Sequence, residues 1–361
     1  MLVQRSADVV GRGFARFSRL TRVSRVAVRT THLLSPPPAV VPVKAGVPRP
    51  RFSVMIPAFN CARYLGQAIE SVLAQALPAE EMEIEVVDDC STLDDPRSVV
   101  EAVGRGRVGF HCRPSNGGAS RAFNTCVERA RGEWIHILHG DDFVMPGFYG
   151  AIDCASRRWP EAGLIAARCF FCDEAGVPEG ITARLPGMEQ GPTHDPSPFF
   201  RITPVQCAGV VVRREVYEQV GGFRPELVYL LDREMWCRAV FAAGGVVLAD
   251  VLASYRRSTA SITGRTRRKA AQLVDAERCA AIMAAEYEGF PAGTVRDDIV
   301  EWARSEADFF RSRGDTEGLA ACRGFWAKRA GLRHRVAAGV IAAEAATRSW
   351  TRRLLRRPPP A

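Results

Sequence analysis

The chain has 361 residues, enough for one large or two modest hydrophobic cores, and its 47% apolar and 25% charged residues are typical of globular proteins. Its net charge of +9 is concentrated at the ends. Residues 1–50 hold nine Arg or Lys and one Asp, and residues 324–361 hold nine and one Glu, which leaves −7 for residues 51–323. The acidic body argues against a nucleic-acid-binding core, so no nucleic-acid partner is expected.

The basic ends suit either solvated tails or contact with anionic lipid headgroups or RNA. No run reaches the ~18 apolar residues of a membrane span. The N-terminus lacks the continuous apolar region of a secretory signal. Eleven cysteines show no paired metal-ligand spacing, and the single CxxC, Cys169 to Cys172, is interpreted as two strand thiols. These features favour a reducing, cytoplasmic location.

Residues 1–50 are predicted to form a basic, proline-rich leader and linker. Arginines recur every three or four residues from Arg12 to Arg29 without forming one clean helical stripe. The stretch from Ser35 to Pro50 is rich in proline and is expected to be extended and exposed. We therefore place the first domain boundary between residues 50 and 51.

The pattern changes at Phe52, where residues 52–57 predict a short buried strand that ends in Pro57 and the turn residues Phe59 and Asn60. Apolar residues at helical spacing follow over residues 64–73, and residues 84–87 predict a second strand. A strand, helix and strand in this order indicate a parallel sheet with a binding site beyond the carboxyl ends of its strands.

Two acids, Asp88 and Asp89, follow the second strand. Each carboxylate can accept hydrogen bonds from a base or a ribose, and for Asp88 a turn or helix-cap role stays equally open. After a third strand candidate at residues 108–110, Asn116-Gly-Gly-Ala-Ser-Arg-Ala-Phe-Asn124 opens a helix. Its glycines would let backbone N–H groups approach a diphosphate, although this is not a P-loop.

A buried strand over residues 134–138 leads directly into His139, Gly140, Asp141 and Asp142. Two carboxylates at a strand end suit Mg²⁺ or Mn²⁺, because both are hard cations that prefer oxygen ligands. A solvated Gly-Asp-Asp turn is the alternative that this stretch alone leaves open.

These motifs, in this order, resemble the family 2 glycosyltransferases, which have the GT-A fold. The resemblance runs from about Ser53 to Thr263. It is carried by Ser53-Val-Met-Ile-Pro-Ala-Phe-Asn60, Val87-Asp-Asp-Cys-Ser91, Asn116-Gly-Gly with Ala122 and Asn124, and Leu138-His-Gly-Asp-Asp142. It implies an α/β fold with a mixed, mainly parallel sheet flanked by helices over residues 51–265.

The resemblance also implies roles for individual residues. Asp89 is expected to contact the nucleotide base, beside the loop around Pro57. Asp141 and Asp142 are expected to bind the metal, with His139 in place of the family's usual first Asp. The wider nucleotide-sugar site is expected to include Phe59, Asn60, Asp88, Asn116, Asn124, Asp141 and Arg256.

The second half of the domain supplies the predicted base. Residues 163–171 and 208–213 are strand-like, and between them lies a long Pro/Gly-rich stretch expected on the acceptor side. Leu231-Asp-Arg-Glu-Met-Trp236 resembles the family's helix start, which makes Asp232 the expected catalytic base; a helix cap is the alternative. In Tyr255-Arg-Arg-Ser258, Ser258 stands where the family has His, so that contact is lost or passed to Arg256 or Arg257.

Residues 266–361 are predicted to form a basic helical extension with Trp302, Phe309, Phe310, Phe325 and Trp326 as packing anchors. Its last segment suits either a membrane surface or a helix packed on the domain.

Taken with the family resemblance, the motifs predict an inverting, metal-dependent transferase. We expect it to move a sugar from a nucleotide donor, with UDP-sugars favoured, to a glycan or lipid-linked acceptor near the inner face of a membrane. The alternative is a catalytically silent nucleotide-sugar or glycan-binding module.

Overall fold

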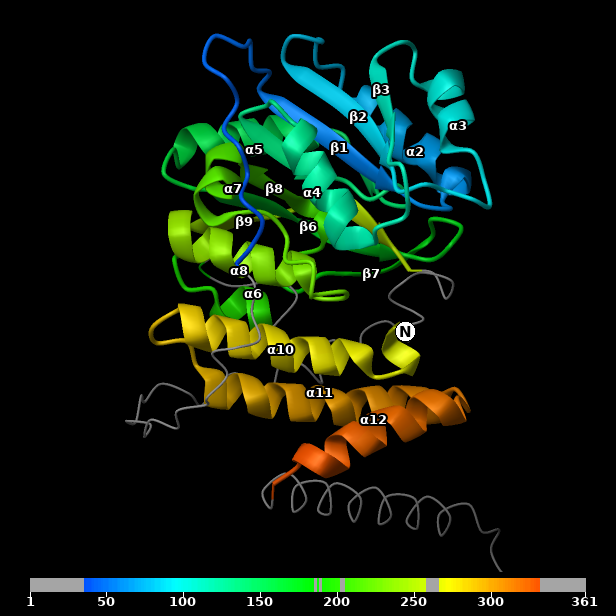
Figure 1. Cartoon of the computed structure of the whole chain (residues 1–361), viewed down its shortest axis with the longest axis vertical. Helices are drawn as coiled ribbons and strands as arrows, with labels where there is room; N and C mark the ends of the chain where they lie inside the picture. The colour runs from blue at the N-terminus through cyan, green and yellow to red at the C-terminus, as the bar shows by residue number, and fades with distance from the viewer. Residues whose placement is uncertain (1–35, 185–186, 188–189, 202–204, 258–265, 332–361) are drawn as a thin grey trace, which may run out of the picture. The chain divides into compact units, whose positions relative to one another are not determined.

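The computed structural model describes residues 36–184, 187, 190–201, 205–257 and 266–331, and its centre is a mixed β-sheet between helices (Figure 1). In the N-terminal half all strand pairs are parallel, and the fully buried β1 lies between β2 and β4. The strands of this half are β1 (Phe52–Ala58), β2 (Met82–Asp88), β3 (Val108–Cys112) and β4 (Trp134–Ile137).

The C-terminal half of the sheet is mixed, and the whole sheet has the order β3-β2-β1-β4-β8-β6-β9-β5, with β7 paired to β6. β8 is antiparallel to both β4 and β6, whereas β6 and β9 are parallel. The mixed sheet flanked by helices is therefore confirmed. The strands of this half are β5 (Phe143–Val144), β6 (Leu164–Cys172), β7 (Pro178–Ile181), β8 (Val210–Arg213) and β9 (Gly245–Arg256).

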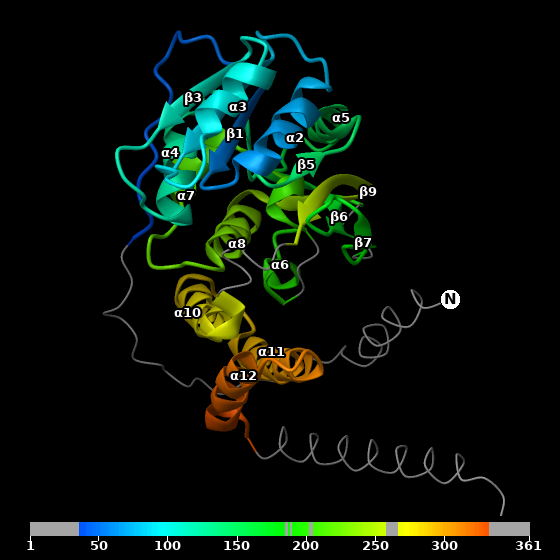
Figure 2. The ribbon, with the colours of Figure 1, turned by 90° about the vertical axis from the view of Figure 1, so that its right-hand side faces the viewer.

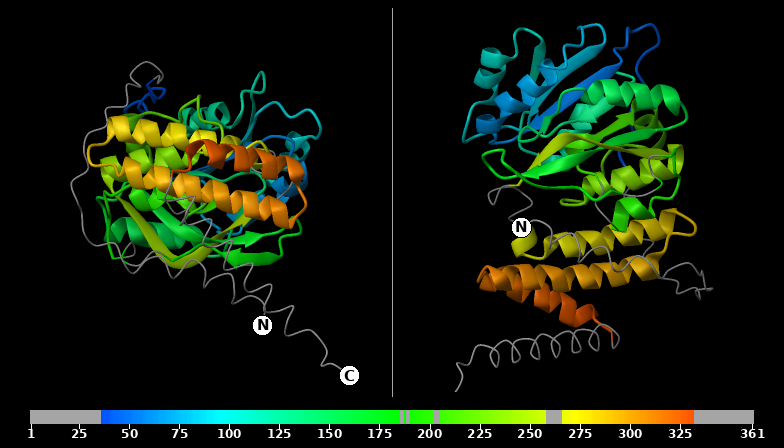
Figure 3. Two further views of the ribbon diagram at one scale, coloured as in Figure 1. Left: turned by 90° about the horizontal axis from the view of Figure 1, so that it is seen from below. Right: turned by 180° about the vertical axis from the view of Figure 1, so that it is seen from behind.

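Helices cover both faces of the sheet. Successive side chains of a strand point to opposite faces, and because the buried strands are apolar on both faces, both must be shielded from water. One face packs on α2 (Ala62–Leu73) and α5 (Phe148–Arg158) (Figure 3). The buried residues of these helices join Val54 and Ile56 in one core. The other face carries three helices, and two further helices pack beside members of these layers. They are α4 (Ala119–Arg129), α7 (Arg214–Val220) and α8 (Leu231–Ala243), with α3 (Pro96–Val103) beside α2 and α6 (Ser197–Arg201) beside α8.

Residues 36–50, predicted to be an exposed linker, are extended and mostly exposed, but they contact the domain at several points. Val40 is buried, and the carbonyl of Val41 accepts a hydrogen bond of 2.9 Å from the guanidinium of Arg214. The N–H of Gly222 donates to the carbonyl of Pro38 at 2.7 Å. This segment therefore contributes to the packing of the domain.

Three helices follow the sheet: α10 (Ala271–Glu286), α11 (Ala292–Ser312) and α12 (Thr316–Arg329). α10 lies between the sheet domain and α11 (Figures 1 and 2). Of the predicted packing anchors, Phe310 and Phe325 are buried, and Phe309 lies between the guanidinium groups of Arg267 and Arg313, each 4.4 Å from the ring centre. The predicted helical extension is thus present over these residues.

None of the helices in the described part of the chain combines the length and apolarity that crossing a membrane requires. The predicted N-terminal leader up to residue 35, the C-terminal segment from residue 332 and Ser258 lie outside the described residues.

We expect Gly132→Ala to destabilise the fold by about 1–3 kcal/mol, as overpacking does in a close-packed interior. A Cβ at Gly132 would lie 2.6 Å from both the backbone nitrogen and the Oγ of Ser53 in β1. The matched control is Gly150→Ala in α5, where a Cβ meets nothing within 4 Å; it should stabilise the fold by about 0.5–1 kcal/mol. Denaturant unfolding measures both, and equal stability of the two variants would contradict the prediction.

Candidate active site

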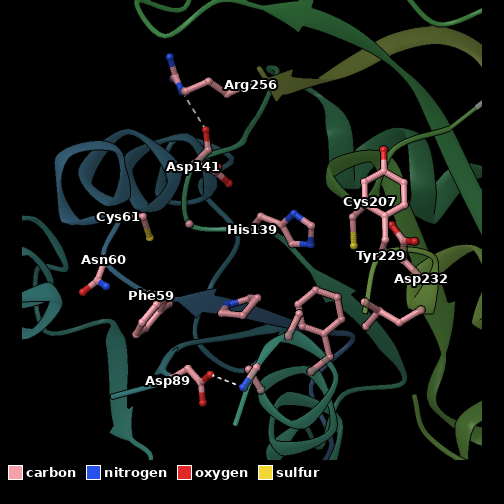
Figure 4. Close-up of a pocket in the computed structure, with 18 of the residues that line it drawn as sticks. Phe59, Asn60, Cys61, Asp89, His139, Asp141, Cys207, Tyr229, Asp232 and Arg256 are labelled. Atoms are coloured by element: carbon pink, nitrogen blue, oxygen red, sulfur yellow. Dashed lines mark hydrogen bonds between the residues drawn. The ribbon is translucent and has the colours of Figure 1, made fainter. Parts of the chain in front are cut away.

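A cavity of about 720 Å³ opens at the carboxyl ends of the parallel strands. Its walls come from the ends of β1 and β2, the start of α4, the loop between β4 and β5, the start of α8 and the end of β9. Parallel strands point their carboxyl ends to one edge of the sheet, so residues distant in sequence meet there. In Figure 4, Phe59 and Asp89 lie on one side of the cavity, His139 is near its middle, and Asp232 lies on the other side with Tyr229 and Cys207.

Most predicted site residues line this cavity. They are Pro57, Phe59, Asn60, Asp89, Asn116, His139, Asp141, Asp232 and Arg256. Asp88, Asn124 and Asp142 do not line it. Each of these three makes contacts that explain its position.

Asp88 is buried and closes a turn. Its carboxylate accepts hydrogen bonds from the N–H of Ser91, at 3.1 and 3.2 Å, and from the hydroxyl of Ser91 at 2.5 Å. This is the turn role that the sequence left open for Asp88.

Asn124 makes hydrogen bonds to both backbone groups of Phe223. Its Nδ2 donates to the Phe223 carbonyl at 2.8 Å, and its Oδ1 accepts from the Phe223 N–H at 2.7 Å. Asn124 therefore holds the turn that precedes α8.

Asp89 faces the cavity, and its carboxylate is already well supplied with donors. It accepts hydrogen bonds from the N–H groups of Gly117, at 3.0 and 3.1 Å, and Gly118, at 2.8 Å, and it pairs with the guanidinium of Arg113. These are the glycine N–H groups predicted to approach a diphosphate. In the structure they hold Asp89 at the cavity wall instead.

Arg113 is a residue that the sequence analysis missed. It directly follows β3, as Asp89 directly follows β2, so its position at a strand end was the available signal. Two residues that line the cavity itself, Tyr229 and Cys207, were also missed. Tyr229 lies in a loop and Cys207 begins a short 3₁₀ helix (Cys207–Gly209), and neither belongs to a motif that gave a comparable signal.

The acidic loop between β4 and β5 is tied to the end of β9. The backbone N–H of Arg256 donates to Asp142 Oδ1 at 2.8 Å, and its guanidinium Nε donates to the Asp141 carbonyl at 2.9 Å. The same guanidinium also donates to Gln67 Oε1 at 2.5 Å and to the Glu174 carbonyl at 2.9 Å. Arg256 therefore fixes the loop, with most of its donors engaged by the protein.

His139, Asp141 and Asp142 form a group that could hold a metal ion, the one such group within the described residues. One ligand atom from each lies within 4.8 Å of the others, and His139 Nδ1 is 3.6 Å from Asp142 Oδ2. Asp142 Oδ2 and His139 Nε2 are buried without a hydrogen-bond partner. Burial and the neighbouring Asp141 charge raise the pKa of the Asp142 carboxyl well above its usual range.

Asp232 occupies the first turn of α8 and lies half-buried at the cavity wall. Its Oδ1 accepts a hydrogen bond of 2.6 Å from the N–H of Arg233. Burial raises the pKa of the Asp232 carboxyl above its usual 3.8, while the charges of Arg233 and His139 partly offset this effect. An acid whose pKa is raised is a stronger base once it is ionised, which suits proton abstraction.

Glu234 lies two residues further along α8 and faces away from the cavity, as its helical position predicts. It is fully buried and pairs with Arg224 at 3.1 Å and Arg238 at 2.8 Å. Asp232 is thus the carboxylate that α8 presents to the cavity.

Solved structures share this architecture. Residues 1–349 of Staphylococcus aureus TarS, in complex with UDP-GlcNAc, match with a TM-score of 0.55 at 18% identity over 73% of this chain and 74% of that one. Mannosyltransferase PcManGT from Pyrobaculum calidifontis, in complex with GDP-Man and Mn²⁺, matches with a TM-score of 0.54 at 18% identity over 87% and 86%. The fold is therefore that of the GT-A glycosyltransferases.

Sequence relatives define the family. The model of glycosyl transferase family 2 matches residues 53–152. The uncharacterized protein MT1568 of Mycobacterium tuberculosis is 28% identical over 64% of this chain and 74% of its own length. The poly(ribitol-phosphate) β-N-acetylglucosaminyltransferase TarS is 31% identical over 26% of this chain, and that match spans 17% of TarS. Residues 53–152 therefore form a glycosyl transferase family 2 domain, and this domain identifies the chain as a glycosyltransferase.

We predict that Asp232→Asn raises the thermal stability of the protein at neutral pH. With a folded-state pKa above the unfolded one, the contribution of Asp232 is complete below pH 3.8 and is lost as the pH rises through the raised pKa. Asparagine cannot ionise, so it avoids this loss. Unfolding temperatures between pH 4 and pH 8 should show a gain at pH 7 that narrows toward pH 4. The exposed control Glu80→Gln should show none, and a lower stability of Asp232→Asn at pH 7 would contradict the prediction.

Proposed function

We propose that this protein transfers a sugar from a nucleoside-diphosphate donor to a hydroxyl group of a glycan or lipid-linked acceptor, with inversion at the anomeric carbon. The observation that carries the proposal is the arrangement of one cavity. Asp89 and Phe59 line its first wall, the His139, Asp141 and Asp142 group lies in the β4–β5 loop, and Asp232 lines the opposite wall.

The donor would bind on the side of β1 and β2. Phe59, with 38% of its surface exposed, offers an aromatic face for a nucleotide base, and Asp89 offers carboxylate oxygens at the same wall. TarS was solved with UDP-GlcNAc and PcManGT with GDP-Man, which supports a nucleotide-sugar donor and makes UDP-sugars the first to test.

The residues of the acidic loop fit a divalent cation. Two buried ligand atoms, Asp142 Oδ2 and His139 Nε2, lack a partner, and Asp141 adds a carboxylate that faces the cavity. An imidazole nitrogen beside two carboxylates is acceptable to Mn²⁺ and suits Mg²⁺ less well, and the PcManGT structure holds Mn²⁺. A bound cation would supply charge neutralisation for the leaving diphosphate.

Asp232 would act as the general base. Its carboxylate takes the proton of the acceptor hydroxyl while the acceptor oxygen bonds to the anomeric carbon. The bond from that carbon to the diphosphate oxygen breaks on the opposite side, and the nucleoside diphosphate leaves with the electron pair. In-line attack of this kind inverts the anomeric configuration, so an α-linked donor gives a β-linked product.

The inner face of a membrane is the proposed working place, as the net charge of +8 on each basic end suggests. Most of the residues concerned lie outside the described ranges, and the proposal therefore rests on the sequence alone. Binding to vesicles with and without anionic lipid measures it directly.

For the transfer reaction we expect Asp232→Asn to lower kcat by about 10²–10⁴-fold while leaving the affinity for UDP unchanged, because the amide cannot accept the proton. The measurement is release of nucleoside diphosphate from a panel of nucleotide sugars, with Mn²⁺ and with glycan and lipid-linked acceptors. Glu80→Gln, which removes an exposed carboxylate, is the control and should match the wild type. Wild-type protein that binds UDP-sugars without turnover would favour a silent binding module.

For the metal we expect Asp141→Asn to weaken Mn²⁺ binding by at least about tenfold, since losing even an outer-shell contact costs that much at other sites. His139→Ala should weaken it as well, because the variant removes the nitrogen ligand. Electron paramagnetic resonance of free Mn²⁺ in the presence of UDP measures the affinity without turnover. His111→Ala on β3 is the control, and unchanged Mn²⁺ affinity in both loop variants would refute the assignment.

A further inference from the structure

A buried carboxylate of α10 holds the loop that precedes Asp232. Asp275 Oδ2 accepts hydrogen bonds from three consecutive backbone N–H groups, those of Val228 at 3.1 Å, Tyr229 at 2.8 Å and Leu230 at 3.0 Å. Asp275 has only 4% of its surface exposed. A loop without regular structure must satisfy its N–H groups elsewhere, and here one side chain satisfies three of them.

This loop forms part of the cavity wall. Val228, Tyr229 and Leu230 all line the cavity, and the chain continues from them directly into α8. Leu230 is the N-cap of α8 and has no side-chain capping bond, so the direction of the first turn depends on how this loop is held. Asp232 lies in that turn, two residues after Leu230.

α10 contacts the same segment at two further points. The guanidinium of Arg278 donates to the carbonyl of Glu226 at 2.7 Å and lies 3.6 Å from Asp275 Oδ1. At the other end of α10, Glu286 pairs with Arg224, which also pairs with the buried Glu234 of α8. The segment from Arg224 to Leu230 is therefore attached to α10 along its length.

We propose that Asp275 is a positioning residue for transfer, and that it sets the acceptor side of the cavity by fixing Tyr229 and the first turn of α8. This inference rests on the proposed function, because it concerns the geometry of the proposed base. It makes the helices after residue 266 part of the active-site architecture. The nucleotide side, formed by β1, β2 and α4, has no contact with Asp275 among the hydrogen bonds and ion pairs of the described residues.

Asp275→Ala tests the proposal. It removes the acceptor of three N–H groups, so hydrogen exchange of the amides in residues 226–231 should speed up. The kcat for transfer should fall about tenfold to a hundredfold, because small displacements of a reacting group have effects of this size. The Kd for UDP, measured by calorimetry, should stay within about twofold of the wild type, because the displacement concerns only the acceptor side. Asp275→Asn keeps an oxygen acceptor and should recover most of the kcat.

A matched control separates positioning from stability. Glu306→Gln weakens another buried carboxylate of the helical region, one that binds Arg267, Gln272 and Trp302 and makes no hydrogen bond to the loop among the described residues. It should lower the unfolding temperature without changing kcat or the exchange of residues 226–231.

Each outcome bears on the inference. If the wild type transfers sugar and folded Asp275→Ala keeps its kcat, or if exchange of residues 226–231 is unchanged, the positioning role is wrong. The same holds if Glu306→Gln lowers kcat as much as Asp275→Ala does. A wild type without transfer to any acceptor would instead overturn the proposed function, and the positioning role with it.

Discussion

The cost of burying negative charge governs the arrangement of this site. The fold brings the carboxylates of Asp88, Asp89, Asp142 and Asp232 to one edge of the sheet, where each is partly or fully removed from water. A buried carboxylate is tolerated when donors compensate it, and otherwise its pKa rises. The protein uses both solutions, and the difference separates acids that are held by donors of the protein from acids whose raised pKa suits proton transfer or metal binding.

Asp88 and Asp89 belong to the compensated kind. Asp88 accepts from the N–H and hydroxyl of Ser91, and Asp89 has Arg113 and two glycine N–H groups. Asp142 and Asp232 are less well supplied: burial raises the pKa of each carboxyl, and one Asp142 oxygen has no partner. The carboxylate oxygens that the protein leaves without enough donors are therefore concentrated at the β4–β5 loop and at the first turn of α8. The proposed function places the cation at the first and the acceptor proton at the second.

The sequence predicted the sheet and the acids at its strand ends because both follow from short-range pattern, whereas Asp232 and Arg256 were expected from the family resemblance. Buried strands followed by polar residues are visible in the chain, and parallel topology places those residues together. The interpretation of Asn124 and of the two glycines was less successful for a physical reason. Whether an amide N–H or a side chain is free depends on long-range partners, here Phe223 for Asn124 and Asp89 for Gly117.

His136 and His139 show the same limit within four residues. Both belong to the stretch that the sequence analysis emphasised, yet only His139 reaches the cavity. His136 is fully buried between the Tyr149 hydroxyl, at 2.8 Å, and the Ala208 carbonyl, at 3.1 Å, and burial lowers the pKa of its imidazole to about 3. Strand alternation predicts that nearby side chains point to opposite faces of the sheet. It does not predict which residues they contact on each face, because those residues come from segments far along the chain.

The two halves of the cavity are stabilised by different kinds of interaction, backbone hydrogen bonds in one and side-chain contacts in the other. The proposed nucleotide side is formed by the ends of β1, β2 and β4. Their parallel pairing is a ladder of backbone hydrogen bonds, which tolerates substitution of side chains. The proposed acceptor side is formed by a loop that a few side chains fix, among them Asn124 from α4 and Asp275 from α10. Residues 53–152, which match the family model, include the first half and exclude Asp232 and its loop. A change in one of these few side chains can therefore reshape the acceptor side while the sheet and the nucleotide side remain folded.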